Sequence, residues 1–382
     1  MNESLPPQKI SKLNKIKGIL AEIRLPRAVK IIYIIAAACL PLNIIFLLSE
    51  SFSDFFNRYI SSVVRGFFAY LTSWIPFSLA EFLIILIPVI VFILTTVIIK
   101  KYGETKAEIL SALLCVFSIL ASIFSTFTLG FSSAYRGTTL DKKLGMTAGE
   151  VSAQQLYDTA LVLIDNLNET VDEVYYGADG FSVMPYGYTE MNIKLLDAFD
   201  DASKEYSFLP RLDSRVKTVM LSEAMSYTHI TGVYTFFTGE SNINIDFPDY
   251  TLPFTAAHEL SHQRGVAREN EANFMAFLVC ARSEDAYIRY CAYLNLYEYV
   301  ANALYYADNT LYRQAWAKLP MCVKEELAAY SNFMDKYRDS AASEVSGAIN
   351  DTFLKFNGTE GTKSYGMVVD LAVAYFAPKQ EN

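Results

Sequence analysis

Two histidines and a glutamate form an H-E-x-x-H pattern in this sequence: His258, Glu259 and His262. On a helix, residues four apart lie on one face about one turn from each other, so both imidazoles can reach a single ion. Glu259 is then displaced round the helix, towards a water held by that ion. This arrangement is typical of zinc hydrolases, in which the ion activates water and the glutamate is the general base.

The residues that flank this pattern predict two helices joined by a turn. Thr251 suits the N-cap of the first helix, and Pro253 suits its first turn, where a missing backbone N–H costs nothing. Gly265 can end that helix. A second helix after the turn would place Glu269 and Asn273 on one face, so a third ligand is expected nearby.

The pattern is specific for a chain with so few histidines. The sequence has three histidines, and two of them fall in H-E-x-x-H. At these frequencies a chance match is expected roughly once in a thousand such sequences. The alternative is an ordinary amphipathic helix whose histidines bind no metal.

The hexapeptide R-E-N-E-A-N at residues 268–273 resembles the R-E-x-E-A-D segment that supplies the third zinc ligand in gluzincin metallopeptidases, such as the prenyl-protein protease group. The resemblance implies that Glu269 binds zinc and that Asn273, in place of Asp, supports a ligand histidine. The gap between the two motifs is shorter here, which leaves Glu271 open as the alternate third ligand. Metzincins have a short gap, but their third histidine would fall at Arg268, so a metzincin is excluded.

The whole chain also resembles an uncharacterised bacterial membrane-protein family, domain of unknown function 3810. The resemblance covers the N-terminal apolar segments and three later stretches, L-P-F-T-A-A-H-E-L-S-H-Q-R-G at 252–265, E-N-E-A-N-F at 269–274 and S-Y-G-M-V-V-D-L at 364–371. It implies a bacterial membrane metallopeptidase without a known substrate.

Three apolar runs, at 31–49, 76–99 and 107–131, are each long enough to cross a bilayer as a helix. Residues 1–30 form a basic tail, and lysines follow the second run, so both are predicted to face the cytoplasm. The chain after the third run, 132–382, is then an extracytoplasmic domain of a multi-pass plasma-membrane protein. The long basic tail and the uninterrupted first run argue against a cleaved signal peptide.

Residues 52–71 carry apolar side chains at helical spacing, with Asp54, Arg58, Ser61, Ser62 and Arg65 on the other face. This pattern predicts an amphipathic helix that either lies in the outer membrane interface, held by its aromatic residues, or packs on the globular domain. The clear separation of apolar from polar side chains on two faces favours the interface.

The rest of the chain predicts a mainly α fold with a small β-sheet, an α+β domain of zincin type. Helical spacing covers 156–171, 193–206 and 283–336, after a linker at 132–150. Short β-rich runs lie at 216–221, 232–237 and 242–246, the last two joined by a hairpin turn at 238–241. An edge strand before the motif helix can pair with an extended peptide, or can simply support that helix.

Charge and cysteine content exclude several function classes. The net charge is -9, and the acidic excess lies in residues 132–382, which is against nucleic-acid binding and against binding of anionic lipid headgroups by the domain body. The five cysteines include no C-x-x-C pattern, so a second metal site is not predicted. One disulfide among Cys280, Cys291 and Cys322 is left open.

Peptide hydrolysis at such a site usually needs a hydrogen-bond donor for the developing oxyanion besides the ion. His229, Tyr227 and Tyr234 are candidates by residue type, and the family resemblance of its segment adds Tyr365.

Arg264 and Arg268 flank the motif. They either bind a substrate carboxylate or pair with Glu269 or Glu271, and the pairing is the favoured alternative for charges so close in sequence.

The sequence therefore predicts a membrane-anchored, zinc-dependent metallopeptidase that acts on a peptide or protein near the lipid bilayer, with Glu259 as general base. The alternative is a catalytically inactive zinc-binding membrane protein that acts as a sensor or scaffold. An intramembrane protease is excluded because the motif stretch is rich in charged residues and lacks an apolar run of spanning length.

Overall fold

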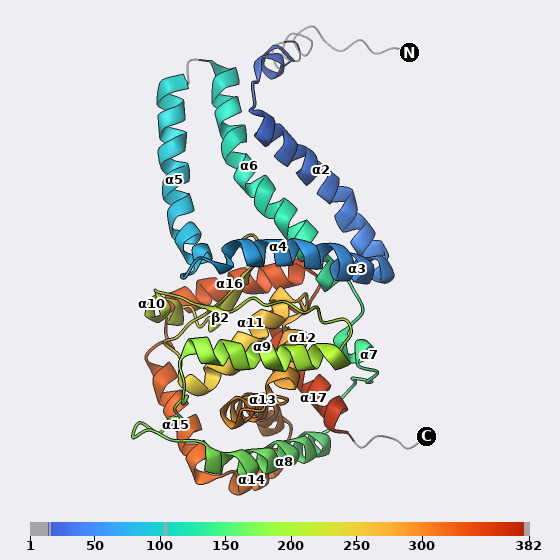
Figure 1. The fold of residues 1–382 in the computed structure, drawn as a ribbon, viewed down its shortest axis with the longest axis vertical. Coiled ribbons are helices and arrows are strands. Elements are labelled where there is room, and N and C mark those ends of the chain that lie inside the picture. Colours follow the sequence, from blue (N-terminus) through green and yellow to red (C-terminus); the bar gives the residue numbers. More distant parts are fainter. Residues whose placement is uncertain (1–13, 15–16, 103–104, 378–382) are drawn as a thin grey trace.

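The structure is a computed structural model that describes residue 14 and residues 17–102 and 105–377. Three long apolar helices stand side by side above a larger, mainly helical body (Figure 1). They are α2 (Arg27–Leu48), α5 (Leu79–Tyr102) and α6 (Lys106–Gly130). Each is long and apolar enough to cross a membrane. The predicted mainly α fold with a small sheet and three N-terminal membrane helices is confirmed.

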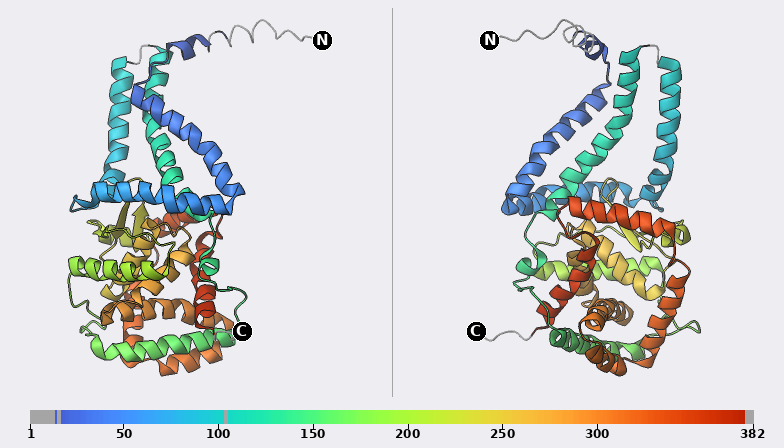
Figure 2. Two further views of the ribbon diagram at one scale, coloured as in Figure 1. Left: turned by 45° about the vertical axis from the view of Figure 1, so that its right-hand side comes forward. Right: turned by 180° about the vertical axis from the view of Figure 1, so that it is seen from behind.

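The amphipathic segment is a nearly continuous helix that lies across the feet of these three helices (Figures 1 and 2). It consists of α3 (Glu50–Phe56), the π-helical turn η1 (Asn57–Ser61) and α4 (Ser62–Ser73). The uninterrupted α-helical spacing therefore hides a π turn, a feature that the side-chain pattern does not reveal.

The segment packs on the globular body, which is one of the two positions proposed for it, and exposes apolar side chains on its other face. The face predicted to be polar is turned onto the globular body, where Ser61 and Arg65 are buried. The apolar side chains of Phe55, Val63 and Phe67 stay exposed on the other face. The segment is thus packed on the domain while presenting an apolar surface of the kind that suits a membrane interface.

The sheet has three short strands, β1 (Lys217–Thr218), β2 (Gly232–Thr235) and β3 (Glu240–Ile243), in the order β1-β3-β2. β2 is antiparallel to β3 and β1 is parallel to it. The hairpin turn occupies residues 236–239, not the predicted 238–241. Gly239 has a positive φ of 71° and its N–H donates to the Thr235 carbonyl, so the chain has already reversed before Glu240.

The membrane helix α5 is tied to this sheet by two carboxylates. Glu240 of β3 accepts hydrogen bonds from the backbone N–H groups of Leu79 and Ala80 at the start of α5, at 3.1 and 2.8 Å. Glu81 in turn accepts from the N–H groups of Met220 and Leu221. Carboxylates at a helix N-terminus satisfy its free N–H groups, so the membrane part and the body share polar contacts as well as apolar ones.

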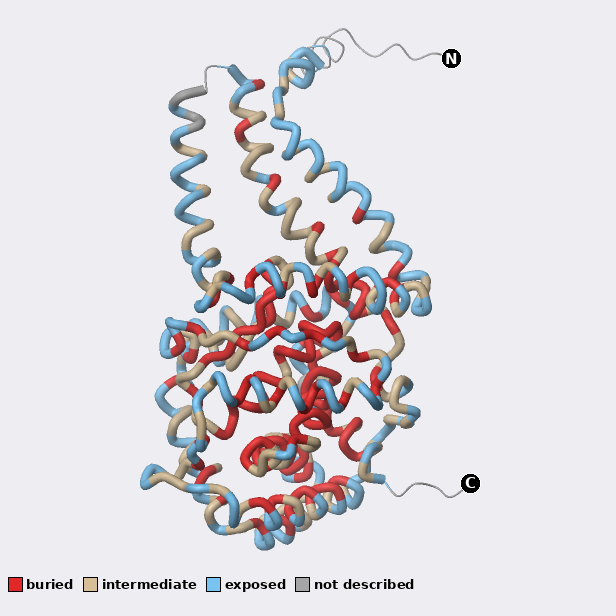
Figure 3. The backbone as a smooth tube through the Cα atoms, viewed as in Figure 1, coloured by how far each residue is buried: buried red, intermediate tan, exposed pale blue. Residues whose placement is uncertain are grey.

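The core of the body surrounds α13 (Ala286–Ala307), which is buried over most of its length (Figure 3). The helices packed round it include α8 (Ala153–Thr170), α11 (Leu252–Gln263), α12 (Glu269–Cys280) and α17 (Val368–Phe376). The remaining helices are α7 (Leu140–Lys143), α9 (Tyr188–Glu205), α10 (Ser222–Ser226), α14 (Asn309–Lys318), α15 (Met321–Asp335) and α16 (Ala341–Phe356). Short 3₁₀ segments are η2 (Ser132–Tyr135), η3 (Val171–Glu173), η4 (Asp249–Thr251) and η5 (Gly361–Met367).

Part of the linker predicted at 132–150 is ordered, because η2 is buried beneath the membrane helices.

Candidate metal centre

The H-E-x-x-H pattern lies on α11, and the turn after it has the predicted form. Thr251 is at the N-cap, but its hydroxyl donates to the Pro248 carbonyl and does not cap the helix. Gly265 follows the helix with a φ of 92°, a left-handed conformation that favours glycine. Inside the helix, the rings of His258 and His262 face the same side, with centroids 4.5 Å apart.

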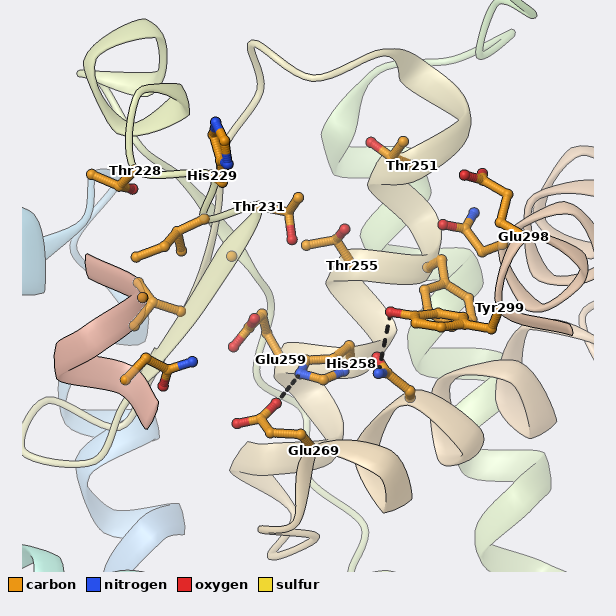
Figure 4. Close-up of a pocket in the computed structure, with 18 of the residues that line it drawn as sticks. Thr228, His229, Thr231, Thr251, Thr255, His258, Glu259, Glu269, Glu298 and Tyr299 are labelled. Carbon is orange, nitrogen blue, oxygen red and sulfur yellow. Dashed lines mark hydrogen bonds and ion pairs between the residues drawn. The ribbon is translucent and has the colours of Figure 1, made fainter. Parts of the chain in front are cut away.

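The turn brings the first residue of α12 back against these two rings. Oε2 of Glu269 lies 3.2 Å from Nε2 of His258 and 3.4 Å from Nε2 of His262. One donor atom from each of the three residues falls within 4.8 Å of the others. This His–His–Glu group could hold a metal ion (Figure 4).

The ring of His262 is fixed by the backbone. Its Nδ1 lies 2.8 Å from the carbonyl oxygen of Val266, which can only accept, so Nδ1 carries a proton and Nε2 is the nitrogen that faces the centre of the group. His258 has no such orienting bond: its Nδ1 is buried and has no partner among the described residues. Orientation of a ligand imidazole through its second nitrogen is a common feature of metal sites.

The charges of the group stabilise one another. Burial acts to raise the pKa of Glu269, but the two neighbouring imidazoles outweigh it and hold that pKa well below its usual range. Burial likewise acts to lower the pKa of His262, yet Glu269 and Glu259 raise it to about 9. The two carboxylates therefore favour a positive charge at this position, which a bound cation would supply in place of the proton.

Glu259 lies beside this group on the cavity side (Figure 4). It is 4% exposed, its Oε2 has no partner among the described residues, and burial raises the pKa of its carboxyl. Its backbone carbonyl accepts a hydrogen bond from Ser241 of β3 at 2.9 Å, which docks α11 on the sheet. Gly232 of β2 packs so closely that a Cβ there would lie 2.6 Å from Oε1 of Glu259. The sheet therefore holds the carboxylate in place from one side.

Glu271 does not join the group. Its Oε1 accepts from the N–H of Leu140 at 3.0 Å and from Arg268 at 2.9 Å. Glu269 and Glu271 were the two carboxylates considered as partners of the flanking arginines. Arg268 pairs with Glu271. Arg264 instead donates to the carbonyl oxygens of Leu260 and Leu212 and stacks on Phe199.

Asn273 makes a contact other than the one expected of it. The amide of Asn273 donates to the hydroxyl of Tyr299 at 3.3 Å, while Nδ1 of His262 is occupied by a carbonyl and that of His258 has no partner among the residues that the structure describes. Asn273 and Glu269 do share a face of α12, as predicted, but the amide of Asn273 bonds to a tyrosine of α13. The structure shows no imidazole–Asn273 bond among the described residues, and the supporting role of Asn273 stays a prediction.

The predicted oxyanion donors are scattered. His229 lines the same cavity with a φ of 57°, but its Nε2 lies 2.8 Å from the Tyr337 carbonyl and its ring points away from His258 (Figure 4). The ring of Tyr227 packs edge-on against Tyr337, and the hydroxyl of Tyr234 is buried without a partner among the described residues. The backbone of Tyr365 is in η5, and its side chain lies outside the described part of the chain.

A hydroxyl near the group belongs to Tyr299 on α13 (Figure 4), and Tyr135 lines the same cavity. Burial, with the carboxylates of Glu298 and Glu269, raises the pKa of Tyr299 to about 12, so it keeps its proton. The sequence offers no local signal for Tyr299, because it is one of 26 tyrosines and lies 37 positions after His262. Only the packing of α13 on α11 and α12 places it here.

The group opens into a cavity of about 1690 Å³. Its walls come from the β2–β3 hairpin, α11, α12, α13, α15, α16 and the segment after α6. All five cysteines are described and are free thiols, so the disulfide left open by the sequence is not formed.

Comparison with known proteins gives a family and nothing beyond it. No curated protein and no solved structure matches the chain. The model of one family, described as "Protein of unknown function (DUF3810)", matches residues 54–373, which include most of the amphipathic segment, both later membrane helices and the complete His–His–Glu group. The chain therefore belongs to the DUF3810 family.

Proposed function

We propose that this protein is a membrane-anchored zinc metallopeptidase. The observation that carries the proposal is the convergence of Nε2 of His258, Nε2 of His262 and Oε2 of Glu269, with the buried carboxylate of Glu259 beside them. A structural ion needs no such neighbour, whereas hydrolysis needs a base next to an open ligand position.

The donor set fits zinc. Nitrogen and carboxylate ligands bind zinc at about 2.0–2.2 Å in a tetrahedron, which places two donors roughly 3.3–3.5 Å apart. The two separations from Glu269, 3.2 and 3.4 Å, match that spacing, and all three donors lie within 4.8 Å of one another. When bound, the ion would supply Lewis-acid polarisation of the peptide carbonyl and lower the pKa of water.

The residues of the chain account for the proton transfers. Glu259 takes a proton from the attacking water, whose oxygen forms a bond to the carbonyl carbon, and delivers that proton to the nitrogen as the C–N bond breaks. The products are a carboxylic acid and an amine, so no co-reactant besides water is needed. The hydroxyl of Tyr299 is the donor placed to stabilise the developing oxyanion, a role for which His229 is poorly oriented.

Strand β2 offers a way to hold an extended peptide. It is an edge strand of the sheet, and its residues Gly232, Val233 and Tyr234 line the cavity next to Glu259. An added strand would pair with this edge, where the backbone of Tyr234 has a hydrogen bond to Glu259, and would carry the scissile bond past the metal group. We expect this domain on the extracytoplasmic side, because the N-terminal tail is basic and lysines follow the second span.

The test is zinc content and peptide turnover of the full chain purified in detergent. The full chain is required because α3 and α4 pack on the domain through buried side chains such as Arg65. Wild type is expected to hold one zinc per chain, His262→Ala and Glu269→Gln to lose it, and Glu271→Gln to keep it. Glu259→Gln is expected to keep zinc and to lose cleavage of a mixed peptide library.

Two results would decide against the proposal. A wild-type protein without stoichiometric zinc removes the metallopeptidase altogether. Stoichiometric zinc without cleavage of any peptide would favour the alternative function, a zinc-binding sensor or scaffold.

A further inference from the structure

The metal group lies next to the layer of helices that faces the membrane. The amide of Asn57 in η1 donates to the carbonyl of Gly265 at 3.0 Å, and the guanidinium of Arg65 in α4 lies 3.4 Å from the carbonyl of Arg264. Both carbonyls lie within three residues of His262 in the sequence. The amphipathic segment therefore touches the end of the metal-binding helix directly.

Aromatic rings connect a membrane helix to the metal group. Phe127 is in the last turn of α6, and its ring lies 5.1 Å from Phe236 after β2. Phe131, one turn later, lies 5.3 Å from Tyr234 and 6.0 Å from the ring of the metal-binding His262. The wall of the cavity nearest the membrane is thus built by the foot of a spanning helix.

Helix α16 completes this wall. It lies just below α4, between the feet of the spans and α11 (Figure 1). Val345 and Ile349 line the cavity and are 60% and 66% exposed, and Phe353, one turn further on, packs on Phe127. Apolar side chains left exposed at helical spacing inside a cleft form a surface for an apolar occupant.

The far side of the cavity mixes polar and aromatic side chains. There α13 contributes Asn295, Glu298 and Asn302 together with Tyr297 and Tyr305. In Figure 1, α13 lies further from the spans than α11 and α16 do. A chain bound in the cavity would therefore meet α16 and the foot of α6 on the side of the spans and α13 on the opposite side.

We propose that the cavity receives the extracytoplasmic segment that directly adjoins a membrane-spanning helix of another polypeptide. The membrane-proximal apolar residues of that segment lie against α16 and the rings at the foot of α6, and the distal residues lie along α13. This inference rests on the proposed peptidase function and specifies its substrate class: membrane-anchored polypeptides cut close to the bilayer surface.

The spacing sets the position of the cut. One helix layer, about 10 Å thick, separates the metal helix from the membrane face of α4. An extended chain covers about 3.3 Å per residue. The scissile bond of a preferred substrate thus lies roughly three to six residues outside its membrane helix.

The test uses the full chain in liposomes with model substrates that share one cleavable sequence. In these, the sequence is separated from a spanning helix by about 4, 10, 20 or 30 residues of flexible linker, and a fifth substrate is the same peptide in solution. Sharing a membrane raises the effective concentration of all four anchored substrates, so only a preference within the series reports on the cleft. The shortest spacer is expected to be cut at least tenfold faster than the longest.

Equal cleavage across the series, or cleavage of the soluble peptide with the same kcat/KM, would overturn the substrate class while leaving the peptidase intact. Absence of cleavage of every substrate would instead count against the peptidase. In that case photo-crosslinking of the short-spacer substrate to the Glu259→Gln variant still reports on binding: crosslinks to α16 support the substrate class, and their absence refutes it.

A pair of matched substitutions tests the apolar wall. The double variant Val345→Ser and Ile349→Ser is expected to raise KM for the short-spacer substrate about tenfold, with zinc content unchanged. Met321→Ser removes an equally exposed apolar side chain, 67% exposed, from α15 outside the cavity lining, and is expected to have no effect. Equal KM values for the double variant and wild type would remove α16 from the binding surface.

Discussion

A single methyl group at Gly232 is expected to impair catalysis without touching a metal ligand. A Cβ at this position would lie 2.6 Å from Oε1 and 2.8 Å from Cγ of Glu259, and 2.8 Å from Cγ2 of Thr255. Ordinary carbon contacts are about 3.5–4.0 Å, so the carboxylate of Glu259 must retreat by about 1 Å. The φ of Gly232 is not in the left-handed region, so the cost is steric and not conformational.

The expected loss follows from that displacement. Misplacement of a catalytic group by about 1 Å costs on the order of 10²-fold in rate, and overpacking of a tight site costs about 1–3 kcal/mol of stability. Gly232→Ala should therefore lower kcat/KM about 100-fold, lower the melting temperature modestly and leave zinc content at one per chain.

The assay is peptide turnover, zinc analysis and thermal unfolding of the same detergent-purified samples. Gly149→Ala is the matched control, because a Cβ there meets nothing within 4 Å. If Gly232→Ala keeps wild-type kcat/KM with full zinc, then Glu259 is not the base that the geometry indicates. Loss of zinc would show that the methyl group disturbs the ligands and not only Glu259.

Three further predictions follow from buried groups. Arg65→Met should lower the free energy of unfolding by about 3 kcal/mol, because the guanidinium donates to the carbonyl of Gly130 at 2.7 Å and to Oδ1 of Asn57 at 2.8 Å. The measurement is thermal unfolding, and an unchanged melting temperature would contradict this expectation. Tyr299→Phe should lower kcat about 10- to 100-fold with zinc retained. An unaltered kcat would show that Tyr299 is not the hydrogen-bond donor to the oxyanion. Burial raises the pKa of Glu298 from 4.5 to about 7, so the folded state keeps a proton that the unfolded state loses. The free energy of unfolding should therefore fall, by at most about 3 kcal/mol, as pH rises from 4.5 to about 7, and Glu298→Gln should make it depend less on pH. The same pH dependence in wild type and variant would refute a role of Glu298 in it.

Much of the site is local in sequence. His258 and His262 share a face because a helix repeats every 3.6 residues, and Gly265 allows the chain to turn back at once. Glu269 and Glu271 are both in the first turn of α12, and about 200° of rotation separates them, so only one can face α11. Which of the two does so depends on how α12 packs, and the sequence left both open.

The same division holds for the membrane part. Length and composition alone identify the three spanning helices, since a bilayer imposes one hydrophobic thickness on any sequence. Periodicity identified the amphipathic segment, but not that its polar face would be buried. That burial depends on acceptors distant in sequence, such as the carbonyls of Gly130 and Arg264, which Arg65 contacts.

Local patterns in the chain were enough to predict the fold class, the spanning helices and the shared face of the motif histidines, because each follows from interactions between residues a few positions apart. Tertiary structure alone decided which glutamate meets the histidines, that Tyr299 replaces His229 beside them, and that α16 and the foot of α6 wall the cavity. Those choices rest on contacts between segments tens to hundreds of residues apart, which no local pattern encodes.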